Sequence, residues 1–193
     1  MKYVDEELFL RGIAMWCLYS LVGTFFAPQL EFLAGLLGTV LFIISLKDVK
    51  QKEPKLESVK NRLKFMTYVI VGIAVIDFIL GRISIQNIST REISAIITSV
   101  EVAVGLYVLR LGIEMLGVEA NTTSNALQIN KLQSAWSTSA IVMASVYGFY
   151  FIMLFIMGNF ALIILMQGLV NVSYALIKIS FLVLFRQELK TKK

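Results

Sequence analysis

Six long apolar stretches run through most of this chain and constrain its fold more than any other feature. They cover 8–27, 30–46, 64–81, 92–117, 134–157 and 159–185. A helix needs about 20 predominantly apolar residues to cross the hydrocarbon core of a bilayer. No long polar block separates the stretches, so residues 1–193 are expected to form a single membrane domain. The predicted fold is an all-α integral membrane bundle of six transmembrane helices.

Two alternatives bear on this architecture. A count of five spans would require 30–46 or 64–81, the shortest stretches, to be re-entrant, and their flanking residues do not indicate this. A weak similarity also relates the chain from Gly38 into the third stretch to the chain from Gly105 into the fifth. Tandem hairpin repeats occur in membrane folds, but apolar sequences resemble one another by chance. A weak tandem hairpin repeat stays open beside six unrelated helices.

Composition excludes several classes of function. Hydrophobic residues make up 58% of the chain and charged residues 16%, against about 45–50% and about 25% in soluble domains. The chain has no histidine and one cysteine, Cys17, which lies in the first apolar stretch. Metal clusters of Cys and His and Ser-His-Asp triads are thereby excluded. We expect no enzymatic activity, no cofactor and no metal, and we expect Cys17 to be a small buried apolar residue.

The distribution of positive charge predicts how the chain is oriented. With six spans, the termini and the loops 47–63 and 118–133 lie on one side of the membrane. That side carries thirteen Lys and Arg residues, counting Lys64 at its edge, and the other side carries only Arg82 and Arg91. The side rich in cations is cytoplasmic by the positive-inside rule. The chain is therefore predicted to lie in the cytoplasmic (plasma) membrane with both termini in the cytoplasm.

Small residues spaced by four or seven mark faces where transmembrane helices approach closely. In the fifth stretch these residues are Ala140, Ala144 and Gly148, and in the fourth they include Gly105 and Gly112. The two helices are therefore expected to occupy the centre of the bundle. Packing within one bundle is favoured over a dedicated oligomer face, because six helices need such faces internally.

Charged residues at membrane depth are costly and are functional candidates by default. Asp77 and Glu101 fall in the outer half of their spans, whereas the inner half carries Arg11, Arg110, Glu114 and Lys178. Glu101 shares a helix face with Gly105 and Gly112, so we expect it to be buried beside a hydrogen-bond donor of the sixth stretch. Arg110 and Glu114 are four residues apart and are expected to pair.

A polar stripe on the sixth stretch is the clearest candidate site. Gln167, Asn171, Tyr174 and Lys178 fall within an arc of about 60° at 100° per residue. Amide groups facing lipid would be left unsatisfied, so the stripe is expected to face the bundle interior or a wet cavity. It is either a set of interhelical hydrogen bonds or, together with Glu101 and Asp77, the wall of an intramembrane polar path.

A second candidate is the basic loop between the second and third stretches. Its cations could contact anionic lipid or a partner protein, although fixing the topology explains them equally well. These residues are Lys47, Lys50, Lys52, Lys55, Lys60, Arg62 and Lys64.

Two functions remain open on the sequence. The first is a small transporter or channel, or the membrane subunit of a transport complex. The alternative is a non-transporting scaffold, sensor or immunity-type protein that binds lipid or a partner. The expected partners are membrane lipids and either another protein or a second copy of the chain. We expect no nucleic acid, because the excess charge is explained by topology.

Overall fold

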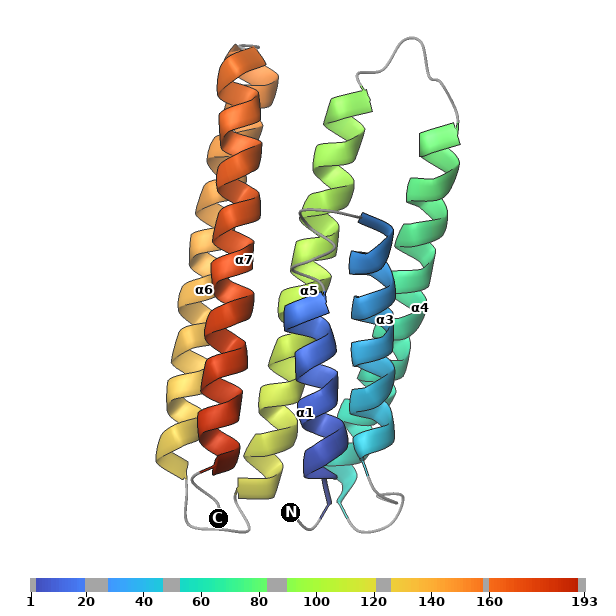
Figure 1. Cartoon of the computed structure of the whole chain (residues 1–193), viewed down its shortest axis with the longest axis vertical. Coiled ribbons are helices and arrows are strands. Elements are labelled where there is room, and N and C mark those ends of the chain that lie inside the picture. The colour runs from blue at the N-terminus through green and yellow to red at the C-terminus, as the bar shows by residue number, and fades with distance from the viewer. Residues whose placement is uncertain are drawn as a thin grey trace.

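The computed structural model describes residues 3–19, 28–46, 53–82, 90–120, 126–157 and 160–190. Within these residues the chain forms six helices and no strand, apart from one isolated bridge between Val4 and Leu46 (Figure 1). Two of the helices end in a π-helical turn. In chain order the elements are α1 (Glu6–Ala14) with η1 (Met15–Tyr19), α3 (Pro28–Ser45), α4 (Pro54–Arg82), α5 (Thr90–Ala120), α6 (Ala126–Ile152) with η2 (Met153–Met157), and α7 (Phe160–Lys190).

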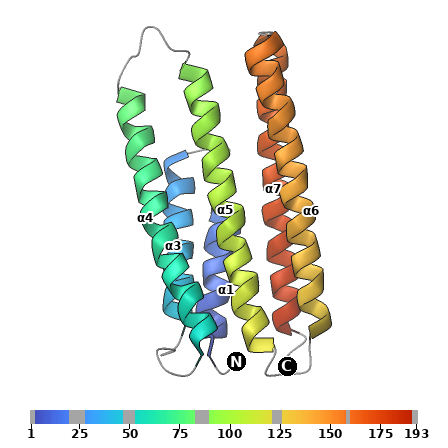
Figure 2. The ribbon, with the colours of Figure 1, turned by 180° about the vertical axis from the view of Figure 1, so that it is seen from behind.

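The helices form a closed ring around a common core. Each helix packs against the next one along the chain, and α7 closes the ring by packing against α1 and η1. Consecutive helices run in opposite directions, so the described chain begins and ends at the same end of the bundle (Figures 1 and 2). We call this the terminal end. Because the described chain begins and ends at the terminal end, the arrangement agrees with an even number of membrane crossings.

Three helical segments are long and apolar enough to cross a membrane, namely Ala95–Ala120, Ile129–Phe155 and Leu162–Gln187. A shorter apolar helix covers Phe32–Ser45. The outer surface of the bundle carries large apolar side chains, such as Ile141, which is 67% exposed, and Phe149, which is 59% exposed. The all-helical prediction is confirmed and these segments indicate membrane insertion, whereas six complete crossings stay a prediction.

Helices α1 and α3 are shorter than the four that follow them. The 9 residues of α1 and the 5 of η1 extend over about 21 Å, and the 18 residues of α3 over about 27 Å, at about 1.5 Å per residue. Neither helix reaches the far end of the bundle, where α4 to α7 continue (Figures 1 and 2). The predicted span 8–27 is helical as far as Tyr19, and residues 20–27 lie outside the described part of the chain.

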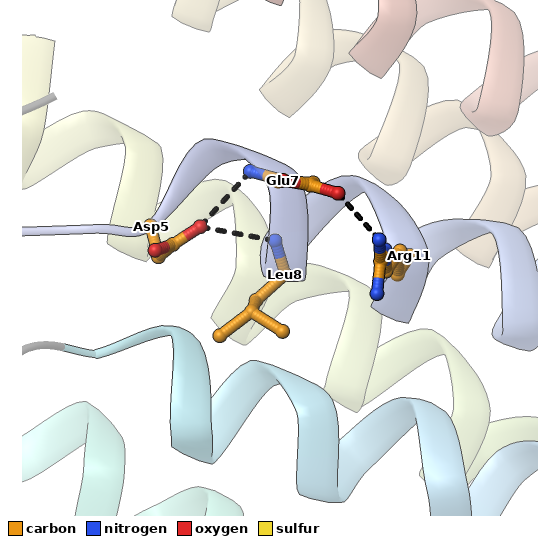
Figure 3. A network of polar contacts seen from close by, with 4 residues as sticks. All are labelled: Asp5, Glu7, Leu8 and Arg11. Carbon is orange, nitrogen blue, oxygen red and sulfur yellow. Dashed lines mark hydrogen bonds and ion pairs between the residues drawn. The ribbon is translucent and has the colours of Figure 1, made fainter.

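The start of the chain is held to the terminal end by polar contacts. The Asp5 carboxylate caps α1 by accepting hydrogen bonds from the backbone N–H groups of Glu7 and Leu8, at 3.1 and 3.2 Å, and Arg11 pairs with Glu7 one turn on (Figure 3). The Asp5 backbone N–H donates to the Ser45 carbonyl at 2.7 Å. An aspartate at this position satisfies N–H groups that a helix start leaves unpaired.

The first two helices cross at a pair of glycines. A Cβ at Gly12 would lie 3.2 Å from the Gly38 carbonyl oxygen, and a Cβ at Gly38 would lie 3.0 Å from the Gly12 carbonyl oxygen. Helix backbones approach this closely only where a side chain is missing. The crossing fixes α1 against α3 and directs the side chain of Trp16, further along η1, into the core.

Candidate functional site

Contacts around Gly112 define a common level near the terminal end of the bundle. A Cβ at Gly112 would be 3.7 Å from the Phe9 ring and 3.9 Å from the Phe185 ring. Half a turn nearer the terminal end, Arg62 Nη2 donates to Glu114 Oε1 at 2.6 Å and joins α4 to α5. These contacts align α1, α4, α5 and α7 at one depth.

Polar residues of neighbouring helices lie at or beyond this level. Lys64 follows Arg62 on α4, and Ile129 lies level with Gly117 because a Cβ at Gly117 would be 3.9 Å from it. Lys131 and Gln133, both exposed, are therefore near the same level on α6. Charged and amide groups concentrate where a bilayer becomes polar. This polar level near Gly112 lies inside the predicted span 92–117 and inside the apolar segment Ala95–Ala120.

Lys178 lies further from the terminal end than this level and is completely buried. Its exposed fraction is 0%, and its Nζ lies 3.8 Å from the centroid of the Tyr174 ring. The Tyr174 hydroxyl in turn presses against the position where a Cβ of Gly105 would stand. Gly105 is seven residues, about 10 Å, further into the membrane than Gly112. The sequence therefore places an ammonium group in the interior of the bundle at a depth where charge is costly.

Trp16 lies beside the Tyr174 hydroxyl at Gly105. A Cβ at Gly105 would be 2.6 Å from Trp16 Cη2, so the indole ring occupies the space that this glycine leaves. The indole Nε1–H donates to Thr39 Oγ1 at 3.2 Å, and the Thr39 hydroxyl donates to the Gly35 carbonyl at 2.8 Å. Trp16 thus connects η1, α3 and α5 with its one polar group satisfied.

Cys17 lies beside this group. It is buried, as expected from its apolar surroundings, and follows Trp16 on η1. Sequence reasoning selected neither Trp16, Thr39 nor Cys17 for the site. The glycines at 35, 38 and 105 were the available signal, because glycines on facing helices leave room for one large side chain.

An aromatic cluster closes the interior towards the terminal end. The Phe9 ring lies 5.2 Å from Phe42 and 5.6 Å from Phe185, and Phe181 lies 6.1 Å from Phe185, between ring centroids. All four rings are at most 1% exposed. They lie between Lys178 and the terminal end, because Phe181 and Phe185 follow it on the same helix. This aromatic cluster separates Lys178 from the terminal end of the bundle.

The polar stripe on α7 changes from buried to exposed along its length. Lys178 and Tyr174 are buried, Asn171 is half-buried and Gln167 is exposed. The expectation that the whole stripe faces the interior is therefore wrong at Gln167, whereas Tyr174 and Lys178 do face it. In the described chain η1 ends first and α3 next, which leaves four helices at the far end, so the outer turns of α7 have fewer neighbours (Figure 1).

The predicted burial of Glu101 is wrong, because its side chain is exposed. Gly112 meets Phe9 and Gly105 meets Trp16, so α5 runs antiparallel to α1 with the two in register. Glu101 lies one turn beyond Gly105, level with the end of η1 at Tyr19. The helix wheel gave the correct face of α5, but the covering helix ends at that level.

The predicted pair of Arg110 and Glu114 is also wrong. Glu114 pairs with Arg62 instead, and hydrogen bonding to Glu114 raises the pKa of Arg62, which precedes the predicted span 64–81. Arg110 is exposed and its guanidinium lies 4.6 Å from the centroid of the Trp136 ring. Arg110 and Glu114 each contact a residue of a neighbouring helix instead of each other. The sequence pattern of one helix cannot reveal such partners.

The small-residue face of α6 does not lie at the bundle centre as expected. Ala144 and Gly148 are exposed, Ala140 is half-buried, and a Cβ at Gly148 would meet nothing within 4 Å. On α5 the prediction holds, since Gly105 and Gly112 are both packed against other helices. The same spacing therefore marks an inner face on one helix and an outer face on its neighbour.

The remaining candidates lie on the surface or outside the described residues. Asp77 is exposed near the Arg82 end of α4. In the basic loop, Lys55 and Lys64 are exposed and Lys60 is half-buried, whereas Lys47, Lys50 and Lys52 lie outside the described residues. Lipid or partner binding by this loop stays a prediction.

Comparison with known proteins gives no relative: no family model, no curated protein and no solved structure matches this chain. Across the described ranges, no three Cys, Asp or Glu residues group in a way that could hold a metal ion. The site is therefore interpreted from its own chemistry, which is a buried ammonium beside a thiol, a phenol and an indole.

Proposed function

We propose that this chain is a transport-class membrane protein, a small transporter or channel or the membrane subunit of one, with Lys178 at the inner end of a polar path. The observation that carries this proposal is the graded exposure of the α7 stripe, from Lys178 at 0% through half-buried Asn171 to exposed Gln167. Polar groups that continue from the surface of a membrane bundle to a buried charge are typical of ligand and ion paths.

The aromatic cluster between Lys178 and the terminal end supports a path that is open in one direction only. The aromatic cluster of Phe9, Phe42, Phe181 and Phe185 separates the ammonium from the terminal end. Alternating access requires a central site that is open towards one side and closed towards the other. Because an ammonium attracts negative charge, an anionic solute or an anionic group of a larger solute is the chemistry that this site favours.

Cysteine labelling tests the path with neighbouring positions on α7. In a Cys17→Ala background, Asn171→Cys places a thiol on the stripe and Val172→Cys places one on the exposed apolar face. A thiol needs water to form the reactive thiolate. We expect a membrane-impermeant thiol reagent to label Asn171→Cys in proteoliposomes and to leave Val172→Cys unlabelled. Protection at both positions would overturn the proposal.

A second candidate function is a membrane scaffold that binds a partner helix. The outward small-residue face of α6, with open space above Gly148, favours this alternative. Small residues let a second helix approach closely. Cross-linking of Gly148→Cys between two chains, or with a partner, in native membranes would support it, and its absence together with labelling of Asn171→Cys would favour transport.

A further inference from the structure

Arg110 is a cationic residue on the outer surface of the bundle, and neither proposed function uses it. The Arg110 guanidinium lies 4.6 Å from the centroid of the Trp136 ring. The Trp136 indole Nε1–H donates to the Leu106 carbonyl at 2.6 Å, one turn before Arg110 on α5. This hydrogen bond fixes the indole ring against α5, so that the ring supports the guanidinium at the seam between α5 and α6.

The stacking leaves the donors of Arg110 directed away from the ring. A guanidinium carries five N–H donors in its plane, and stacking on an aromatic face uses none of them. In the described chain no ion pair includes Arg110, and the carboxylate nearest to it along α5, Glu114, is paired with Arg62. The side chain is exposed on the surface of α5. The N–H groups of the Arg110 guanidinium can therefore donate to an acceptor from outside the bundle.

The depth of Arg110 in the membrane indicates the chemical class of that acceptor. We place the membrane boundary on α5 at the polar level near Gly112, so Arg110 lies two residues, about 3 Å, inside it. At that depth the abundant anion is the phosphate of a membrane phospholipid, and planar guanidinium groups bind phosphate oxygens two at a time. Tryptophan is also enriched at this depth of membrane proteins.

The surface above Arg110 provides a track for an acyl chain. Ala103 and Ile96 lie seven and fourteen residues before Arg110 on α5, hence on the same face, and both are exposed. Seven residues return a helix to within about 20° of the starting direction. The exposed face of α5 thus presents a cation near the boundary and a narrow apolar strip running into the membrane.

We infer that Arg110 and Trp136 form a binding site for an anionic phospholipid in the leaflet at the terminal end. The guanidinium binds the lipid phosphate, and one acyl chain lies along Ala103 and Ile96. The inference rests on α5 and α6 crossing the membrane, which their length and composition support. It does not depend on transport, and it concerns residues separate from the basic loop.

Tryptophan fluorescence tests the site directly, because the chain has only Trp16 and Trp136. Trp16 is 5% exposed and contributes the same background in every sample. The protein is reconstituted in phosphatidylcholine vesicles that contain a minor fraction of phosphatidylglycerol, with bromine on the acyl chains of one lipid at a time. The measured quantity is the quenching by brominated phosphatidylglycerol relative to brominated phosphatidylcholine at equal fractions.

We expect the wild-type chain to prefer phosphatidylglycerol by about fivefold, the ratio that corresponds to about 1 kcal/mol per cation near an anionic surface. Arg110→Gln is expected to reduce the ratio to about one. Arg110→Lys keeps the charge without the flat fork, so an intermediate ratio is expected. The matched control is Lys131→Gln, which removes an exposed cation near the same level of α6 and is expected to keep the wild-type ratio.

Three outcomes would overturn the inference. A wild-type ratio near one would mean that no anionic lipid is selected. Equal losses in Arg110→Gln and Lys131→Gln would mean that general charge attraction, rather than this site, sets the ratio. Loss of the preference on addition of inorganic phosphate would mean that the site takes a free anion. Circular dichroism of each variant establishes its helical fold, and Arg110→Lys keeps the test decisive if Arg110→Gln does not fold.

Discussion

The ammonium of Lys178 lies 3.8 Å from the centroid of the Tyr174 ring, one turn earlier on α7, and both side chains are buried. Side chains on a helix lean towards its N-terminus, so Lys178 reaches back over Tyr174. The Tyr174 hydroxyl stands where a side chain at residue 105 would begin. The position of the buried charge therefore depends on a missing side chain in α5.

Gly105→Ala is predicted to destabilise the bundle. The added Cβ would lie 2.6 Å from Trp16 Cη2 and closer still to the Tyr174 hydroxyl. Overpacking of this kind typically costs about 1–3 kcal/mol. Gly148→Ala is the matched control, because its Cβ would meet nothing within 4 Å and alanine favours the helix. Thermal unfolding in detergent measures both, and equal midpoints for the two variants would contradict the packing around Gly105.

Thr39→Val is predicted to destabilise the chain by leaving the Trp16 indole N–H without its acceptor. A buried donor without a partner costs about 1–3 kcal/mol. Thr67→Val is the control, because the Thr67 hydroxyl donates only to the Leu63 carbonyl of its own helix, at 3.1 Å. We expect a small effect there. If chemical unfolding in detergent gave the same loss for both variants, the hydrogen bond from Trp16 would contribute nothing specific.

The ion pair between Arg62 and Glu114 is predicted to contribute about 0.5–1 kcal/mol, because both side chains are partly exposed and water screens them. A double-mutant cycle of Arg62→Gln and Glu114→Gln measures this coupling. The hydrogen bond raises the pKa of Arg62, so its contribution is present below the unfolded-state pKa and is lost only as the pH rises through the folded-state value. The coupling should therefore stay constant from neutral to moderately alkaline pH, and a loss in that range would contradict it.

The sequence was sufficient to predict the helices, their order and the inner face of α5. Apolar length and the spacing of Gly105 and Gly112 are local properties, and both are reproduced in the structure. The burial of Tyr174 and Lys178 was also predictable, because a charged group avoids lipid, whereas the amide end of the same stripe is exposed at Gln167.

The errors at Glu101, Arg110 and the α6 face have one physical origin. A helix wheel gives the direction of a side chain but not what lies in that direction. Glu101 is exposed because η1 ends at its level, and Arg110 meets Trp136 because α6 lies beside it. Trp16 was missed because its role depends on three glycines from two other helices. Such features follow from the relative lengths and register of neighbouring helices, which no single segment encodes.

The proposed orientation places the terminal end in the cytoplasm. Reporter fusions after Lys193 and within 82–91 test it, because α7 ends at the terminal end, whereas α4 ends and α5 begins at the opposite end of the bundle (Figure 1). We expect cytoplasmic activity only at the first position, given the thirteen-to-two division of cations. Cytoplasmic activity at the second position would contradict both the orientation and the even number of crossings.

We propose that the buried charge of Lys178 serves a function and is not needed to hold the bundle together. Lys178→Met tests it, because methionine fills similar space without the charge, and Lys64→Met at the exposed level of α4 is the control. Taking an ammonium group out of water costs several kcal/mol, and a methionine side chain does not carry that cost. We expect Lys178→Met to unfold in detergent at the same thermal midpoint as the wild type or at a higher one. A midpoint several degrees lower, with Lys64→Met unchanged, would show that the ammonium is structural and would contradict the account.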